Sequence, residues 1–209
     1  MSFHARRLAR RNFQRTTPSA WPAILTWRAP DASRMESVRV QLFGKRIKAN
    51  GRIVAAAAET HPAFGVYYDL QTDDTGVTKR LGLTVTLAER ERQLSIARDD
   101  ENMWLVTDHR GQSRASYDGA LDVDVVFSAF FNALAIRRCN LHRHEQSITL
   151  PIMYVSLPDM SVDAAVLSYS SAGPRHGNEI KLHSPVADTT VTVDADGFVV
   201  DYPGLAERI

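Results

Sequence analysis

Two aspartates and two arginines are the residues of this chain whose types and spacing best suit chemistry. Asp122 and Asp124 alternate with Val123 and Val125, and Arg137-Arg138 follow shortly after. Alternate residues of a strand share a face, so the two carboxylates are predicted to lie together, about 6–7 Å apart. Paired carboxylates are the acid and base groups of glycosidases. A guanidinium fork suits a phosphate, a carboxylate or a sugar.

The same four residues also have a simpler interpretation. Aspartates and arginines facing each other across a hairpin form surface ion pairs, each contributing about 0–1 kcal/mol when exposed. The alternative is a polar site on the inner side of a curved sheet. The spacing alone leaves both interpretations open.

Three elements must position these side chains. Residues 120–127 are predicted to form a half-buried strand, and residues 136–141 a returning strand. Between them, the apolar run around Asn132 is too short for a stable helix, so we expect a tight corner with buried aromatic rings. Neighbours in a strand point to opposite faces. Only one of Arg137 and Arg138 is therefore expected to face the aspartates.

Other chemistries have weaker support in the sequence. There is no GxGxxG after a strand, no phosphate-binding P-loop and no GxSxG elbow. His142 and His144 would share a strand face but lack a clear third ligand for a metal. The single cysteine, Cys139, excludes an internal disulfide, and its strand position is typical of a small buried side chain. No metal and no cofactor are expected.

Composition indicates a globular protein with a charged beginning. Of 209 residues, 44% are hydrophobic and 23% charged, as in ordinary globular proteins. Residues 1–20 hold five arginines and no acid. We expect this basic arm to be poorly ordered, with no specific nucleic-acid partner, although it would suit nucleic acid or anionic lipid. No window is long and apolar enough for a membrane span, so a cytoplasmic location is expected.

The remaining chain, residues 21–209, reads as one mainly β domain with little helix. Polar turns separate short alternating segments, which favours a sandwich, barrel or rolled sheet. Asn50-Gly51 is the strongest hairpin signal. Basic pairs that follow a polar corner at 73–81 and again at 132–139 suggest two related halves. The predicted strands are 23–27, 37–43, 46–49, 52–58, 64–70, 77–87, 93–97, 104–107, 112–116, 120–127, 136–141, 147–150, 153–157, 162–168, 179–183, 189–193 and 198–202.

Two blocks of sequence resemble a known family. They are LDVDV at 121–125 with the following NAL and IRR, and VDADGFVVDYPGL at 193–205. With weaker agreement at Glu36, Val38 and Arg39, the likeness runs over roughly residues 23–208. These segments are similar to those of the putative glycolipid-binding family of bacteria. The resemblance implies a long, strongly curved antiparallel sheet rolled on itself, shaped like lipoprotein carriers with an apolar concavity.

The leading hypothesis is therefore a non-enzymatic protein that binds a glycolipid or another amphipathic molecule. Acyl chains would occupy the apolar concave face, and polar side chains would address the head group. The alternatives are a hydrolase acting on a glycoside or ester through the paired aspartates, and a purely structural or partner-binding domain. The candidate ligand-binding residues are Asp122, Asp124, Asn132, Arg137, Arg138, Asp201 and Tyr202.

Overall fold

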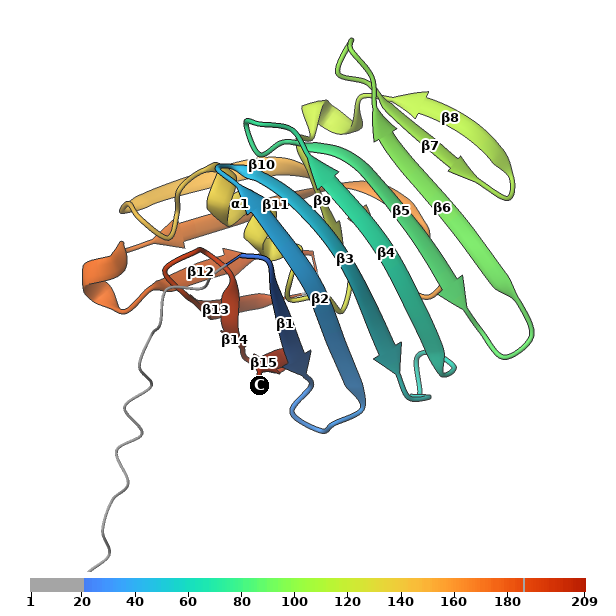
Figure 1. Cartoon of the computed structure of the whole chain (residues 1–209), viewed down its shortest axis with the longest axis horizontal. Helices are drawn as coiled ribbons and strands as arrows, with labels where there is room; N and C mark the ends of the chain where they lie inside the picture. Colours follow the sequence, from blue (N-terminus) through green and yellow to red (C-terminus); the bar gives the residue numbers. More distant parts are fainter. Residues whose placement is uncertain (1–20, 186) are drawn as a thin grey trace, which may run out of the picture.

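A computed structural model describes residues 21–185 and 187–209 (Figure 1). Within them, fifteen strands form one sheet and a short helix, α1 (Asn132–Arg138), lies in its hollow. Short 3-10 turns are η1 (Tyr117–Gly119) and η2 (Pro174–His176). The strands are β1 (Ala23–Arg28), β2 (Arg34–Phe43), β3 (Arg46–Ala55), β4 (Phe64–Thr72), β5 (Thr78–Thr86), β6 (Glu91–Arg98), β7 (Trp104–Asp108), β8 (Gly111–Ala115), β9 (Asp122–Val125), β10 (Gln146–Val155), β11 (Val162–Ser171), β12 (Glu179–His183), β13 (Asp188–Val193), β14 (Val199–Tyr202) and β15 (Ala206–Arg208).

The strand order is β8-β7-β6-β5-β4-β3-β2-β1-β15-β14-β13-β12-β11-β10-β9. Every pairing is antiparallel except β9 with β10, which is parallel. The sheet is open and curls around α1, as Figure 1 shows. The prediction of a mainly β protein with one strongly curved, rolled sheet and little helix is confirmed.

Alternation explains which face of each strand is buried. In β4, Val66, Tyr68 and Leu70 are buried, whereas Tyr67 between them is exposed. The same period of two runs through β3 and β5, so one face of the sheet carries the core and the other meets solvent. The pattern in the sequence therefore located most strands to within a few residues.

The hairpin predicted at Asn50-Gly51 is wrong. Both residues lie inside β3, which pairs with β2 and β4 along its length. The glycine serves packing instead, because the ring of Tyr68 lies directly over it. A Cβ atom added at Gly51 would be 2.1 Å from Cζ of that ring. A glycine inside a strand commonly marks such a close approach.

The corner and returning strand predicted at 130–141 are also wrong, since the chain forms α1 there. Its first five residues are all buried, so the helix is stabilised by packing against the sheet and not by its own length. The preceding strand, β9, is shorter than expected and buried on both faces. Asp122 and Asp124 consequently lie in the interior instead of on a half-exposed surface.

Two smaller differences between the predicted and the observed strands lie in the second half of the sheet. The segments predicted at 147–150 and 153–157 form one strand, β10, whose pairing with β11 continues through Pro151. The sequence also gave no sign of β15, a three-residue strand between β1 and β14. Ladder pairing with longer neighbours explains why so short a strand is stable here.

The concave side of the sheet is occupied by aromatic side chains around α1. Phe130 stacks on Tyr68 at a centroid distance of 6.0 Å, and Phe131 contacts the same ring at 5.1 Å. Phe198 also stacks on Phe130, at a centroid distance of 6.1 Å. The apolar concavity expected for acyl chains is thus largely filled by the protein's own core.

The basic segment 1–20 lies outside the described residues. Within residues 21–185 and 187–209, no helix has the length and apolarity needed to cross a membrane.

Candidate ligand cavity

A cavity of about 500 Å³ remains beside the filled core, where several elements meet. It lies between the end of β9, the start of α1, strand β10, and the turns that follow β12 and β14. Its size is that of a pocket for one small molecule. The lining residues are Asp124, Val125, Val126, Phe127, Ser128, Asn132, Tyr154, Ser184, Ala187, Tyr202, Pro203, Gly204 and Leu205.

Asp124 presents the carboxyl group of this cavity. It is only 9% exposed and accepts a hydrogen bond from the N–H of Val125 at 3.0 Å. Burial raises the pKa of Asp124 to about 7, the nearby carboxylate of Glu36 adds to the rise, and the Val125 bond opposes it. Near neutral pH the group therefore exists in both forms. It can accept a hydrogen bond from a ligand or donate one.

Asn132 supplies an amide at the start of α1. Its side chain is 3% exposed, and its Oδ1 atom has no hydrogen-bond partner among the described residues. A buried acceptor left without a donor costs about 1–3 kcal/mol. Asn132 is also a lining residue of the cavity, so this amide lies at the boundary between the cavity and the packed core.

Aromatic rings form the walls. Burial raises the pKa of Tyr154 to about 12, with Asp124 contributing, and burial also raises the pKa of Tyr202. Both hydroxyls therefore stay protonated at neutral pH. Phe127 adopts a φ of 72°, which is unusual for a bulky residue, and this conformation turns the chain between β9 and α1. The Arg34 guanidinium lies 4.6 Å from the centre of the Phe127 ring.

Arg34 also secures the rim of the cavity, since it donates a hydrogen bond to the carbonyl oxygen of Leu205 at 3.0 Å. It is not itself part of the lining. Among the described residues, the lining contains no lysine, arginine or histidine. The described lining itself therefore offers no cation to an anion, since Arg34 at the rim is engaged by Leu205 and Phe127, and its polar groups suit a neutral ligand rich in hydroxyls.

Behind the cavity, Glu36 fixes the segment that joins β9 to α1. Its buried carboxylate accepts hydrogen bonds from Tyr68 Oη at 2.7 Å and Ser128 Oγ at 2.5 Å. It also accepts from the N–H groups of Ala129 at 2.9 Å and Phe130 at 3.3 Å. Burial raises the pKa of Glu36, and these four bonds oppose the rise. The carboxylate thus acts as a clamp that holds Ser128 and the start of α1.

Comparison with known proteins agrees with the fold. The family described as putative glycolipid-binding matches residues 24–208. The chain belongs to this family. A crystal structure of a DUF1089 family protein from Pseudomonas aeruginosa is 24% identical, with a TM-score of 0.68 over 88% of this chain and 95% of that one, and shares its fold. No curated protein matches the chain.

In this member of the putative glycolipid-binding family, the predicted site residues separate into two groups. Asp124, Asn132 and Tyr202 meet at the cavity. Asp201 is exposed on β14 and does not line the cavity. Thus the strand neighbours Asp201 and Tyr202 reach different surroundings, as alternation requires.

The other three predicted residues are engaged away from the cavity. Arg138 holds Asp122 through two nitrogens, with the shortest contact 2.6 Å from Nη2 to Oδ2. Burial raises the pKa of Asp122, and this contact opposes the rise. Arg137 donates to the carbonyl oxygen of Asp196 and lies 5.1 Å from the ring centre of Phe198. Both arginines therefore connect α1 to its surroundings.

Sequence reasoning missed Glu36, Ser128 and Tyr154 as parts of this region. Glu36 did carry a signal, because it alternates with Val38 and Val40 and so occupies an inward position of β2. A single acid on the apolar face of a strand predicts a buried, hydrogen-bonded carboxylate. Nothing in the sequence indicated that Tyr154 would reach the same cavity.

Proposed function

We propose that this protein binds an amphipathic molecule, such as a glycolipid, through the cavity beside α1 and carries out no catalysis. The single observation that carries the proposal is the cavity itself, where the buried Asp124 carboxyl and the Asn132 side chain stand among aromatic rings. The family assignment supports the same ligand class.

The polar groups select the head of the ligand. Asp124 offers an acceptor or a donor depending on its protonation, and the Asn132 side chain also lines the cavity. This combination matches vicinal hydroxyls, each of which is both donor and acceptor. With no cation in the described lining, a sugar or polyol head is favoured over a phosphate or sulfate.

The walls select the rest of the ligand. Phe127, Tyr154 and Leu205 present apolar surface to the cavity. A volume of about 500 Å³ holds a sugar ring with the first part of one chain, but not several complete acyl chains. A ligand with one chain, or one whose chains extend out of the cavity, is the best match.

A glycosidase-like mechanism through Asp122 and Asp124 has less support. Such a mechanism needs both carboxyl groups in one cleft. Asp122 faces Arg138 and is absent from the cavity lining, whereas Asp124 contributes to it. The geometry favours binding over hydrolysis.

The test begins with native mass spectrometry of the purified protein, followed by organic extraction of any added mass. Calorimetric titration then compares n-octyl β-D-glucoside with octyl phosphate, each below its critical micelle concentration. We expect the glucoside to bind and the phosphate not to bind. Asn132→Leu should abolish glucoside binding without unfolding the protein, since leucine has a similar size and removes an unpaired oxygen.

Asp201→Asn is the matched control, because it changes an exposed polar group on the adjacent strand β14. It should bind the glucoside like the unaltered protein. Equal binding of phosphate and glucoside would contradict the proposed head-group preference. Unchanged glucoside binding by Asn132→Leu would show that the cavity is not the site.

A further inference from the structure

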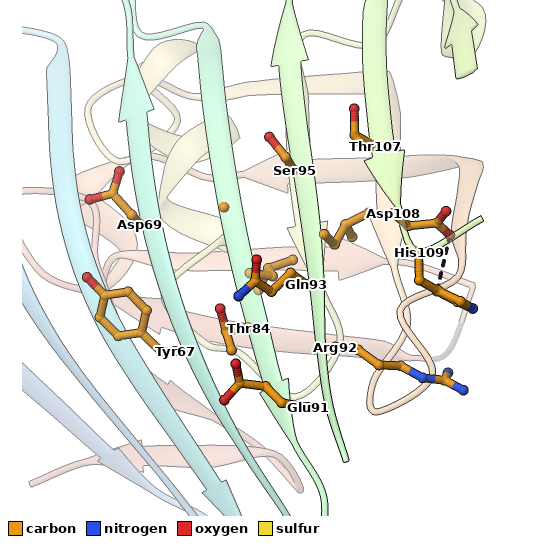
Figure 2. A pocket seen from close by; sticks show the side chains of 13 residues that line it. Tyr67, Asp69, Thr84, Glu91, Arg92, Gln93, Ser95, Thr107, Asp108 and His109 are labelled. Atoms are coloured by element: carbon orange, nitrogen blue, oxygen red, sulfur yellow. Dashed lines mark ion pairs between the residues drawn. The ribbon is translucent and has the colours of Figure 1, made fainter. Parts of the chain in front are cut away.

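A second hollow lies on the opposite, solvent-facing side of the sheet. Its volume is about 540 Å³, and it extends across β4, β5, β6 and β7 (Figure 2). The core side chains of these strands point the other way, so the hollow and the cavity beside α1 are on different faces of the sheet. Its lining comprises Tyr67, Asp69, Gly82, Leu83, Thr84, Glu91, Arg92, Gln93, Leu94, Ser95, Thr107, Asp108 and His109.

Neither a positive φ nor a close neighbour requires the two glycines on this part of the sheet. Gly82 lies in the middle of β5 and Gly65 near the start of β4, both in regular register with their partners. Neither has a positive φ, and a Cβ atom added at either would meet nothing within 4 Å. Gly51 differs, because the Tyr68 ring covers it.

A glycine weakens the interior of a strand, since it adds conformational entropy to the unfolded chain and has no side chain to pack. Packing explains Gly51, but it does not explain Gly65 or Gly82. No β-bulge interrupts the pairing at Gly65 or Gly82, which leaves two common reasons for such a glycine, a sharp bend of the strand or the close approach of a ligand to the backbone.

Tyr67 lies between these two open positions. On β4, Tyr67 comes two residues after Gly65. Its partner across the ladder is Thr84 of β5, which comes two residues after Gly82. Its side chain is 44% exposed, a large aromatic surface for an outward strand position. The Asn50 amide donates to its hydroxyl at 3.4 Å, which restricts the ring. The Arg52 guanidinium lies 5.9 Å from the centre of the ring, so the ring is a held and partly exposed platform near the open position at Gly82.

Polar groups surround the platform. Asp69 is held by Asn50 Nδ2 at 2.5 Å and by Arg80 at 3.2 Å, so its carboxylate has a fixed position. Figure 2 shows Gln93, Ser95 and Thr107 on the neighbouring strands, facing the same hollow. An aromatic face with fixed carboxylate, amide and hydroxyl groups matches a pyranose ring, whose C–H face is apolar and whose rim carries hydroxyls.

We propose that this outer hollow, defined by Tyr67, Asp69, Gly82 and Gln93, binds a neutral oligosaccharide, with one sugar ring stacked on Tyr67 and the chain passing over Gly82. The three carboxylates of the lining, Asp69, Glu91 and Asp108, outnumber its guanidinium, Arg92, and its imidazole, His109, which disfavours an acidic glycan. This site is independent of the cavity beside α1. It requires no lipid chain.

Titration calorimetry with lipid-free hexasaccharides of glucose, mannose, galactose and N-acetylglucosamine tests the proposal on the full chain. At least one should bind. Tyr67→Ala should weaken that binding by about tenfold or more, because it removes the stacking surface. Gly82→Val should also abolish binding while leaving the thermal midpoint unchanged or higher, since valine favours strands and its side chain meets free space.

Phe43→Ala is the control for losing an exposed aromatic ring, because Phe43 is 63% exposed at the far end of β2. It should bind like the unaltered protein. Asn132→Leu should do so as well, which separates this site from the cavity beside α1. The proposal fails if no hexasaccharide binds, or if Gly82→Val and Tyr67→Ala both retain full affinity.

Discussion

Asp124→Asn should change how the stability of this protein depends on pH. Burial raises the pKa of Asp124 to about 7 in the folded chain, against 3.8 for an ordinary aspartate. At pH values below about 3.8 the carboxyl is protonated in both states and costs no stability. As pH rises from about 4 to about 7, the unfolded chain ionises first, so the free energy of unfolding falls. Above about pH 7 the loss is complete.

The size of this loss in the free energy of unfolding follows from the shift in the pKa of Asp124. Three pKa units at about 1.4 kcal/mol each give a cost of roughly 4 kcal/mol at alkaline pH. Asparagine keeps the shape and an acceptor for the Val125 N–H but carries no charge. At pH 8, Asp124→Asn should therefore be more stable by up to about 4 kcal/mol, which corresponds to roughly 10 °C in the thermal midpoint for a chain of this length.

Urea denaturation at pH 4 and pH 8 provides the assay. The difference in the free energy of unfolding between Asp124→Asn and the unaltered protein should be small at pH 4 and large at pH 8. Taking the difference removes the contribution of the other titrating groups. Asp201→Asn, at an exposed position, should show no such change. A difference that is the same at both pH values would refute the interpretation of Asp124 as a destabilising buried acid.

Three further substitutions test the packing around α1. Glu36→Gln should lower the free energy of unfolding by about 2–4 kcal/mol in urea titration, because an amide accepts fewer of the four hydrogen bonds that the carboxylate accepts. Unchanged stability would contradict the idea that Glu36 holds Ser128 and the start of α1. Arg138→Met should cost about 3–5 kcal/mol by leaving Asp122 buried without its partner, and adding Asp122→Leu should recover much of that loss in a double-mutant cycle. Gly51→Ala should cost about 1–3 kcal/mol in thermal unfolding, since the new methyl group overlaps the Tyr68 ring; a neutral effect would mean that the ring moves freely.

The strands were largely predictable because their signal is local. The alternation through residues 64–70 and 179–183 reflects one buried face, and β4 and β12 formed there. The helix α1 was not predictable in the same way. Seven residues are too few for a helix to be stable alone, so α1 depends on aromatic contacts with strands distant in the sequence.

The candidate site was predictable only in part. Asp124 and Asn132 were identifiable because polar residues in an apolar stretch must find a polar environment. One arginine was expected to face the aspartates, and Arg138 does hold Asp122, but it does so from a helix and away from the cavity, whereas Arg137 turns toward Asp196. The curvature of the whole sheet brings in Tyr154 and the turns after β12 and β14, and no local pattern encodes that curvature.

The pairing of β1 with β15 has a consequence for how the chain folds. From β8 to β1, and again from β15 to β10, each strand pairs with its neighbour in the sequence, so both halves can form by successive short-range hairpins. Among the strands of the described residues, the two halves share a single pairing, β1 with β15, whose aligned residues are Trp27 with Arg208 and Arg28 with Glu207. These are among the most distant partners in the chain, and the entropy of closing so long a loop makes their meeting the slow step. Nascent chains would thus hold two partly formed half-sheets, each with an unpaired edge exposed, until β15 is synthesised and joins them.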